Sequence, residues 1–146
     1  MKTPVALALS GLFCFATTFA VADDLPEFAP QEATELSLDD FKWIARPIVV
    51  FADTSADPRF QQQLDRLEAE WPVLADRDVV VITDTDPDDP SEVRKKLRPR
   101  GFMMTLIAKD GTVALRKPQP WTVREITRTI DKMPDREQEI RDRRSN

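Results

Sequence analysis

The chain has 146 residues, of which 26 are acidic and 21 basic, and its formal net charge is −5. This length suits one small domain rather than two with independent cores. The sequence contains one cysteine, no histidine and no tyrosine, which excludes a serine-histidine triad and the usual zinc sites. Its acidic balance argues against nucleic-acid binding, which requires clustered cations.

The first 22 residues have the features of a signal peptide. Lys2 precedes an uncharged apolar run, and Ala20-Val21-Ala22 fits the small-residue pattern that signal peptidase recognises. A retained membrane anchor is the alternative, but Asp23 and Asp24 follow the run where a basic cluster would stop transfer. We expect cleavage after Ala22, a periplasmic or secreted protein, and no stable membrane insertion after cleavage.

Cleavage would change the chemistry open to the chain. It removes Lys2 and the single cysteine, Cys14, which leaves 26 acidic and 20 basic residues. A mature chain without a thiol has no route to disulfide exchange or to a cysteine nucleophile.

The first ordered elements are predicted between Ser37 and Phe51. Residues 23–36 have the composition of an acidic extended arm without a sustained apolar period. A capped turn is expected from Ser37 to Pro47. The β-branched and aromatic run Ile48–Phe51 then predicts a strand that is buried on both faces.

A helix and a second buried strand are predicted next. Asp57 and Pro58 suit the N-cap and first position of a helix, and Pro72 should end or kink that helix. The run Val79–Ile82 predicts a strand parallel to the first, because a crossover helix joins the two. A right-handed crossover places Asp53 and Asp84, which follow these strands, at one edge of the sheet.

The remaining elements are a short helix, a hairpin and a last helix. The short helix runs from Ser91 to about Leu97, and an Asp110-Gly111 turn joins the antiparallel strands 102–108 and 113–116. Thr122 caps the last helix, which reaches Met133. The charged tail 135–146 is either a frayed helix or disordered.

The order β-α-β-α-β-β-α over residues 37–134 is that of a single thioredoxin-like α/β domain. The family-like segments are Phe41-Lys42-Trp43, Arg46 to Ala52, Arg77 to Ile82, Gly101-Phe102, Leu106 to Gly111, Ile130 to Pro134 and Arg136 to Arg141. Together they resemble the thioredoxin-like DUDES domain of unknown function, which occurs in exported bacterial proteins and in animal matrix proteins such as Equarin and the sushi-repeat proteins. The resemblance covers residues 37–144.

The resemblance to thioredoxins lacks both redox hallmarks. Ala56 and Arg59 stand where the two redox cysteines would be, and Met103 stands where the cis-proline would be. The resemblance therefore implies the fold, and it gives no support to reductase, isomerase or peroxidase activity.

The candidate ligand site is the loop edge of the predicted sheet, where open α/β sheets bind their ligands. Its residues are Asp53, Asp57, Arg59, Asp84 and Arg100. A cation in the first turn of a helix opposes the macrodipole, so Arg59 should pair with one of the three aspartates or serve an outside anion. Turn chemistry and helix capping are the alternative reason for these residues.

Two groups of basic residues and three tryptophans are further candidates for binding a ligand or partner. The basic groups are Arg94, Lys95, Lys96, Arg98 and Arg100, and then Arg116, Lys117, Arg124 and Arg128. Ion pairs within the chain are one reading of them and an anionic partner is the other. The first group has no interleaved aromatic residues, so single-stranded nucleic acid is not expected. Trp43, Trp71 and Trp121 are expected to be core or packing residues, and a sugar-binding platform is the alternative.

We expect no cofactor and no metal. The acidic stretch from Asp84 to Glu92 fails the EF-hand register, because Asp89 takes the place of the glycine and Lys95 that of the bidentate glutamate. The leading interpretation is an exported, redox-inactive domain that binds an unknown envelope protein or a small anionic ligand. The alternatives are a hydrolase with Asp53 and Asp84 as acid and base, and an envelope stability factor without a dedicated pocket.

Overall fold

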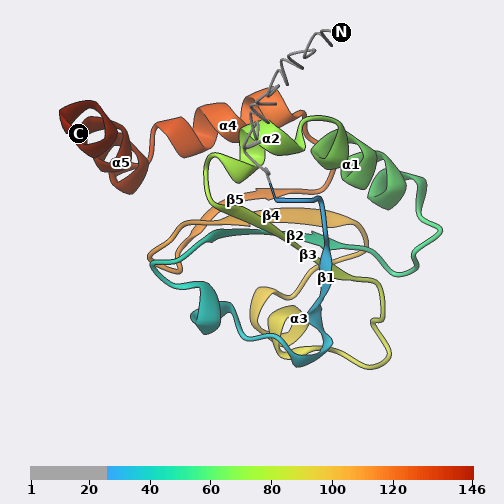
Figure 1. The fold of residues 1–146 in the computed structure, drawn as a ribbon. Coiled ribbons are helices and arrows are strands. Elements are labelled where there is room, and N and C mark those ends of the chain that lie inside the picture. The colour runs from blue at the N-terminus through green and yellow to red at the C-terminus, as the bar shows by residue number, and fades with distance from the viewer. Residues whose placement is uncertain (1–25) are drawn as a thin grey trace, which may run out of the picture.

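The computed structural model describes residues 26–146, which form a mixed five-stranded sheet with helices on both faces (Figure 1). The strands are β1 (Gln31–Glu32), β2 (Arg46–Phe51), β3 (Val79–Asp84), β4 (Met103–Ile107) and β5 (Val113–Lys117). The helices are α1 (Pro58–Ala69), α2 (Trp71–Ala75), α3 (Glu92–Leu97), α4 (Val123–Asp131) and α5 (Pro134–Ser145), with short 3-10 helices η1 (Ala33–Glu35) and η2 (Leu38–Phe41).

The predicted signal peptide and its cleavage after Ala22 lie outside the described residues. Within residues 26–146, no helix is both long enough and apolar enough to cross a membrane.

The strand order is β1-β3-β2-β4-β5. β1, β3 and β2 run parallel, whereas β4 is antiparallel to β2 and β5 is antiparallel to β4. The predicted parallel pair and the predicted hairpin are therefore confirmed. This mixed sheet in a single α/β domain is compatible with the thioredoxin-like fold expected from the sequence.

The core lies on both faces of the sheet. Every residue of β2 is buried, which confirms the prediction for the run Ile48–Phe51. Ile48 and Val50 pack with the residues of α1 and α4 on one face, and Val49 and Phe51 pack with those of α3 on the other. Figure 1 shows the same division, with α1, α2 and α4 above the sheet and α3 below it.

Local signals in the sequence set the helix ends. The Asp57 carboxylate accepts a hydrogen bond from the Arg59 amide at 2.8 Å and caps α1, with Pro58 as its first residue. α1 ends at Ala69, before the turn of α2 that contains Pro72. Thr122 forms a reciprocal capping box with Glu125 at the start of α4.

The structure differs from the sequence predictions in the N-terminal arm and at one tryptophan. Gln31–Glu32, in the expected extended arm, pairs with β3, and Ala33 is buried. The charged tail, for which a frayed helix and disorder were both left open, is the helix α5. Trp71 and Trp121 pack against the core, but the prediction was wrong for Trp43, which is 70 % exposed.

A buried arginine holds α5 against the sheet. Arg46, at the start of β2, is fully buried and donates hydrogen bonds to the Arg77 carbonyl at 2.8 Å and to Glu139 at 3.0 Å, and it also pairs with Asp135. Glu139 also accepts a hydrogen bond from Lys109 at 2.7 Å. These contacts explain why the charged tail is helical, because its acidic side chains neutralise cations that are buried or partly buried.

Candidate functional site

One edge of the sheet contains the carboxyl ends of the three parallel strands, together with the start of β4 and the end of β5. Phe51 at the end of β2 pairs with both Asp84 and Met103. Met104 in turn pairs with Lys117 at the end of β5. The predicted site residues flank these strand ends in the chain, so the structure places all five of them at the predicted edge.

Asp84 is part of a buried ion pair. Its carboxylate accepts hydrogen bonds from Ser91 Oγ at 2.6 Å and Arg94 Nε at 2.9 Å. Arg94 also donates to the carbonyl oxygens of Ala52 and Asp84, and both side chains are less than one-tenth exposed. These contacts satisfy the carboxylate, which gives it a structural role in joining α3 to the ends of β2 and β3.

Ion pairing within the chain was one of the two interpretations of the basic group that contains Arg94, and the structure supports it for this residue. That the pair is buried was missed in the sequence. The signal that could have revealed it is its position next to Val93 and three residues before Leu97. Both of these apolar residues are buried, so Arg94 lies on the helix face that points inward.

Arg59 pairs with Asp57, which was one of its three predicted partners. The Arg59 guanidinium donates to Asp57 at 2.8 Å, and this side-chain hydrogen bond lowers the pKa of Asp57. The guanidinium also lies 5.5 Å from the centre of the Phe102 ring. Arg59 is thus tied to the cap of α1 while it borders the residues that precede β4.

Asp53 and Arg100 are both exposed. A Cβ atom added to Gly101 would lie 4.0 Å from Asp53 Oδ2, so Asp53 faces the segment that leads into β4. Asp53 is therefore open to solvent while Asp84 is neutralised by Arg94. This arrangement gives no support to the two carboxylates as an acid and base pair.

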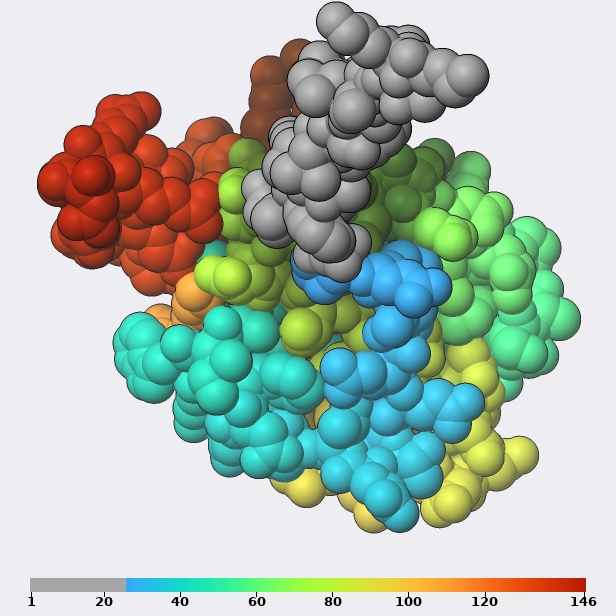
Figure 2. All heavy atoms as spheres, viewed as in Figure 1, coloured from blue at the N-terminus to red at the C-terminus, as the bar shows by residue number. Residues whose placement is uncertain are grey.

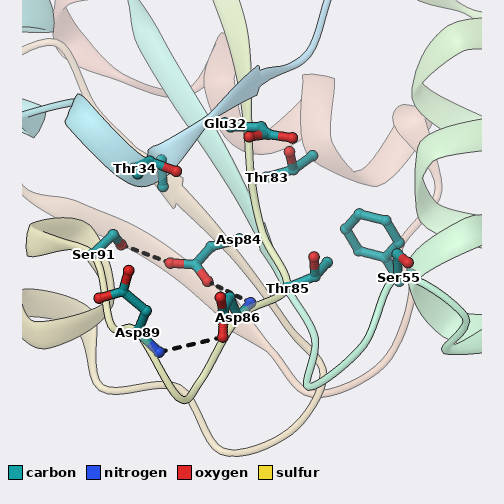
Figure 3. Close-up of a pocket in the computed structure, with 11 residues that line it drawn as sticks. Glu32, Thr34, Ser55, Thr83, Asp84, Thr85, Asp86, Asp89 and Ser91 are labelled. Carbon is teal, nitrogen blue, oxygen red and sulfur yellow. Dashed lines mark hydrogen bonds between the residues drawn. The ribbon is translucent and has the colours of Figure 1, made fainter.

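An acidic pocket of about 460 Å³ lies beyond the ends of β1, β2 and β3 (Figure 3). Neighbouring strands β2 and β3 lead to helices on opposite faces of the sheet, which opens a crevice between their loops. The polar lining consists of Glu32, Asp84, Asp86 and Asp89 with the hydroxyl residues Thr34, Ser55, Thr83, Thr85 and Ser91. Within residues 26–146, no group of three or more potential ligand side chains is arranged to hold a metal ion.

Figure 3 shows that the loop after β3 is organised by its own side chains. Asp84 accepts the hydrogen bond from Ser91, and Asp86 accepts one from the backbone amide of Asp89 at 3.2 Å. Two carboxylates of the acidic stretch that invited a calcium interpretation, those of Asp84 and Asp86, therefore serve turn formation and helix positioning.

A second pocket, of about 240 Å³, lies at the start of β4 and the end of β5, and we call it the basic pocket. Its lining consists of the cations Arg98, Arg100, Arg116 and Lys117 and the apolar residues Phe102, Met103 and Pro118. None of the ion pairs among residues 26–146 includes any of these four cations.

Two of these cations are held by contacts other than ion pairs. Arg116 donates to the Leu97 carbonyl at 2.5 Å, and Lys117 Nζ lies 4.3 Å from the centre of the Trp121 ring. The sequence placed Arg98 and Arg100 in one basic group and Arg116 and Lys117 in another. The β4–β5 hairpin joins the groups, because the end of β5 lies beside the start of β4.

A protein-family model described as a domain of unknown function, DUF4174, matches residues 37–139. The chain belongs to this family. A search of curated proteins gives no match. The DUF4174 match includes all the residues of the basic pocket, and it ends at Glu139, the residue of α5 that binds Arg46.

Proposed function

We propose that this DUF4174 protein is an exported, redox-inactive binding domain whose basic pocket takes a small ligand with a carboxylate or phosphate group. Membership of the thioredoxin-like DUDES family is part of the proposal and rests on the segments quoted above. The single observation that carries the binding site is the set of four cations around an apolar floor, none of which has a carboxylate within ion-pair distance among the described residues.

The electrostatics of the basic pocket favour an anion. The chain as a whole is acidic, and its other arginines include many that carboxylates neutralise, as in the Arg94–Asp84 and Arg77–Asp131 pairs. Like charges gathered in one pocket repel one another, and an anion between them removes that repulsion. Arginine suits this task because its planar guanidinium binds carboxylate or phosphate with two parallel hydrogen bonds.

The floor of the basic pocket adds a preference for an apolar group on the ligand. Phe102 is buried, and Met103 and Pro118 line the same pocket. Arg59 lies against the Phe102 ring, so it borders the pocket without leaving Asp57. A ligand with an anionic group and an apolar body satisfies both the cations and the floor.

We predict that Arg100→Ala and Arg116→Ala each weaken anion binding roughly tenfold, which corresponds to one lost charge-assisted hydrogen bond. The measurement is calorimetric titration with phosphate, citrate and benzoate at constant ionic strength. Arg124→Ala, which removes an exposed arginine from α4, is the matched control and should bind as the wild type does. Equal affinity in wild type and both pocket variants, or no binding of any of the three anions, would contradict the proposal.

If the protein is exported, its mature form should have a defined N-terminal residue. The protein recovered from the exported fraction should begin at Asp23, because Ala20-Val21-Ala22 offers the cleavage site. Intact-mass analysis checks this expectation. A mass that includes Cys14, in a protein held in membranes, would show that the segment is a retained anchor.

A further inference from the structure

Two large apolar side chains stand exposed at the edge of the sheet opposite the basic pocket. Trp43 is 70 % exposed and Ile44 is 69 % exposed, and we call the pair the apolar tip. They precede β2, whose six residues span about 20 Å at roughly 3.3 Å per residue. The basic pocket lies at the far end of that strand, beside Met103, which pairs with Phe51.

The backbone holds the apolar tip in a fixed conformation. Trp43 has a φ of +62°, in the left-handed region that bulky residues rarely adopt. Its amide donates to the Lys109 carbonyl at 2.7 Å, and the amides of Ile44 and Ala45 donate to the Phe41 carbonyl at 3.0 Å. In Figure 1 this teal segment meets the β4–β5 turn, and Figure 2 shows it at the surface.

Four acidic residues lie in the segments next to the apolar tip, and we call Asp39, Asp40, Asp78 and Asp110 its acidic collar. Lys42 pairs with Asp39 at 3.0 Å, and Lys109 pairs with Asp78 at 2.8 Å. The β4–β5 turn that carries Asp110 lies against the tip, because a Cβ atom on Gly111 would lie 2.7 Å from the Lys42 side chain. Lys96 also approaches Asp39, at 3.7 Å. Asp39 and Asp78 are thus paired, whereas Asp40 and Asp110 have no ion-pair partner among residues 26–146 and leave the collar with a small excess of negative charge.

The apolar tip and the basic pocket are complementary in charge and in polarity. One is an apolar projection with a negative collar, and the other is an apolar-floored pocket with a positive rim. They lie at opposite edges of the same sheet, so one copy cannot join its own tip to its own pocket. Two copies can do so in a head-to-tail arrangement.

We propose that the apolar tip of one copy docks into the basic pocket of a second copy. This proposal shares its pocket with the proposed function, so an anionic ligand and the tip compete for the same cations. Trp43 is the anchor of the contact, since tryptophan is the residue most enriched among side chains that dominate binding energy. A membrane surface is disfavoured as the occupant, because the acidic collar is repelled by anionic headgroups.

The test is sedimentation equilibrium over a wide range of protein concentration. Trp43→Asn removes the tip while it keeps a residue that tolerates the left-handed conformation, and Arg100→Glu with Arg116→Glu reverses the charge of the pocket. Wild type should self-associate at high concentration, and each of these two variants alone should remain monomeric. Val73→Asn, at a residue that is 42 % exposed on α2, is the control and should behave as wild type.

Mixing the two variants gives the sharper result. The Trp43→Asn variant keeps its pocket and the charge-reversed variant keeps its tip, so an equimolar mixture should form one-to-one dimers that do not grow. Excess citrate should dissociate the wild-type assembly. A wild type that stays monomeric, a Trp43→Asn variant that still associates, a mixture that fails to pair or wild-type binding to anionic vesicles would each overturn the proposal.

The outcome is separable from that of the proposed function. Anion titration of the monomeric Trp43→Asn variant tests the basic pocket without any tip to compete for it. Binding there supports the anion site whether or not the copies associate. If the wild type associates but the Trp43→Asn variant binds no anion, the docking of tip into pocket is supported and the anion site is contradicted.

Discussion

Replacing Asp84 by alanine should lower the free energy of unfolding by about 3–5 kcal/mol, the usual cost of leaving one partner of a buried ion pair uncompensated. Arg94 would keep its hydrogen bonds to the carbonyls of Ala52 and Asp84, but its charge would have no carboxylate within the buried site. The measurement is urea-induced unfolding followed by circular dichroism.

Asp53→Ala is the matched control, because Asp53 follows the neighbouring strand and is exposed. Its effect should stay within about 0.5 kcal/mol. The double variant Asp84→Ala with Arg94→Met should be more stable than Asp84→Ala alone, since it removes the uncompensated charge together with its partner. Equal stability of Asp84→Ala and wild type would contradict the structural role of this pair and would reopen the interpretation of Asp84 as a site residue.

Replacing Glu139 by glutamine should lower the free energy of unfolding at neutral pH by about 3–4 kcal/mol. Partial burial raises the pKa of Glu139, but hydrogen bonds from Lys109, Arg46 and Arg136 outweigh burial and lower this pKa from 4.5 to about 2. Each unit of difference between the folded and unfolded pKa corresponds to roughly 1.4 kcal/mol. The neutral amide keeps the shape of the side chain and loses this contribution.

The effect of Glu139 on stability depends on pH in a defined direction. Because its folded pKa lies below 4.5, its contribution is complete above that pH and is lost as the pH falls toward 2. The stability difference between wild type and Glu139→Gln should therefore shrink over this range in urea unfolding series. Glu137→Gln, at an exposed position of the same helix, is the control. A difference that stays constant with pH would contradict the ion pairs of α5.

Elements with strong local signals were predictable from the sequence. The continuous apolar runs of β2 and β3 predicted buried strands, and Asp57-Pro58 and Thr122 predicted the starts of α1 and α4. These signals come from residues within one element, and the packing of neighbouring elements favours the same local structure.

Elements that depend on distant partners were not predictable in the same way. β1 has only two residues, and its pairing with β3 defines it. α5 has little apolar surface, and ion pairs with Arg46 and Lys109 hold it in place. Exposure of Trp43 follows from a left-handed backbone conformation, which hydropathy does not reveal.

The five candidate residues were predicted to share one edge of the sheet, and the cap by Asp57 and the pairing of Arg59 were predicted as well. The buried pair of Asp84 with Arg94 was not. Crossover handedness was enough to bring Asp53 and Asp84 to one end of the sheet. Whether a charged residue is paired depends on contacts across elements, so the sequence did not separate paired Arg94 from the cations of the basic pocket. The partners of Arg100 in that pocket come from β5, which lies beside β4 only in the folded chain.

Residue-resolved NMR can show directly whether the basic pocket binds anions. The measurement is a titration of the ¹⁵N-labelled Trp43→Asn variant with citrate at constant pH and ionic strength. We expect saturable shifts of the amides of Arg98, Arg100, Phe102, Met103 and Lys117, with little change around the acidic pocket at Thr85 and Asp86. Shifts spread over the basic surface without saturation, or confined to residues outside the basic pocket, would contradict it.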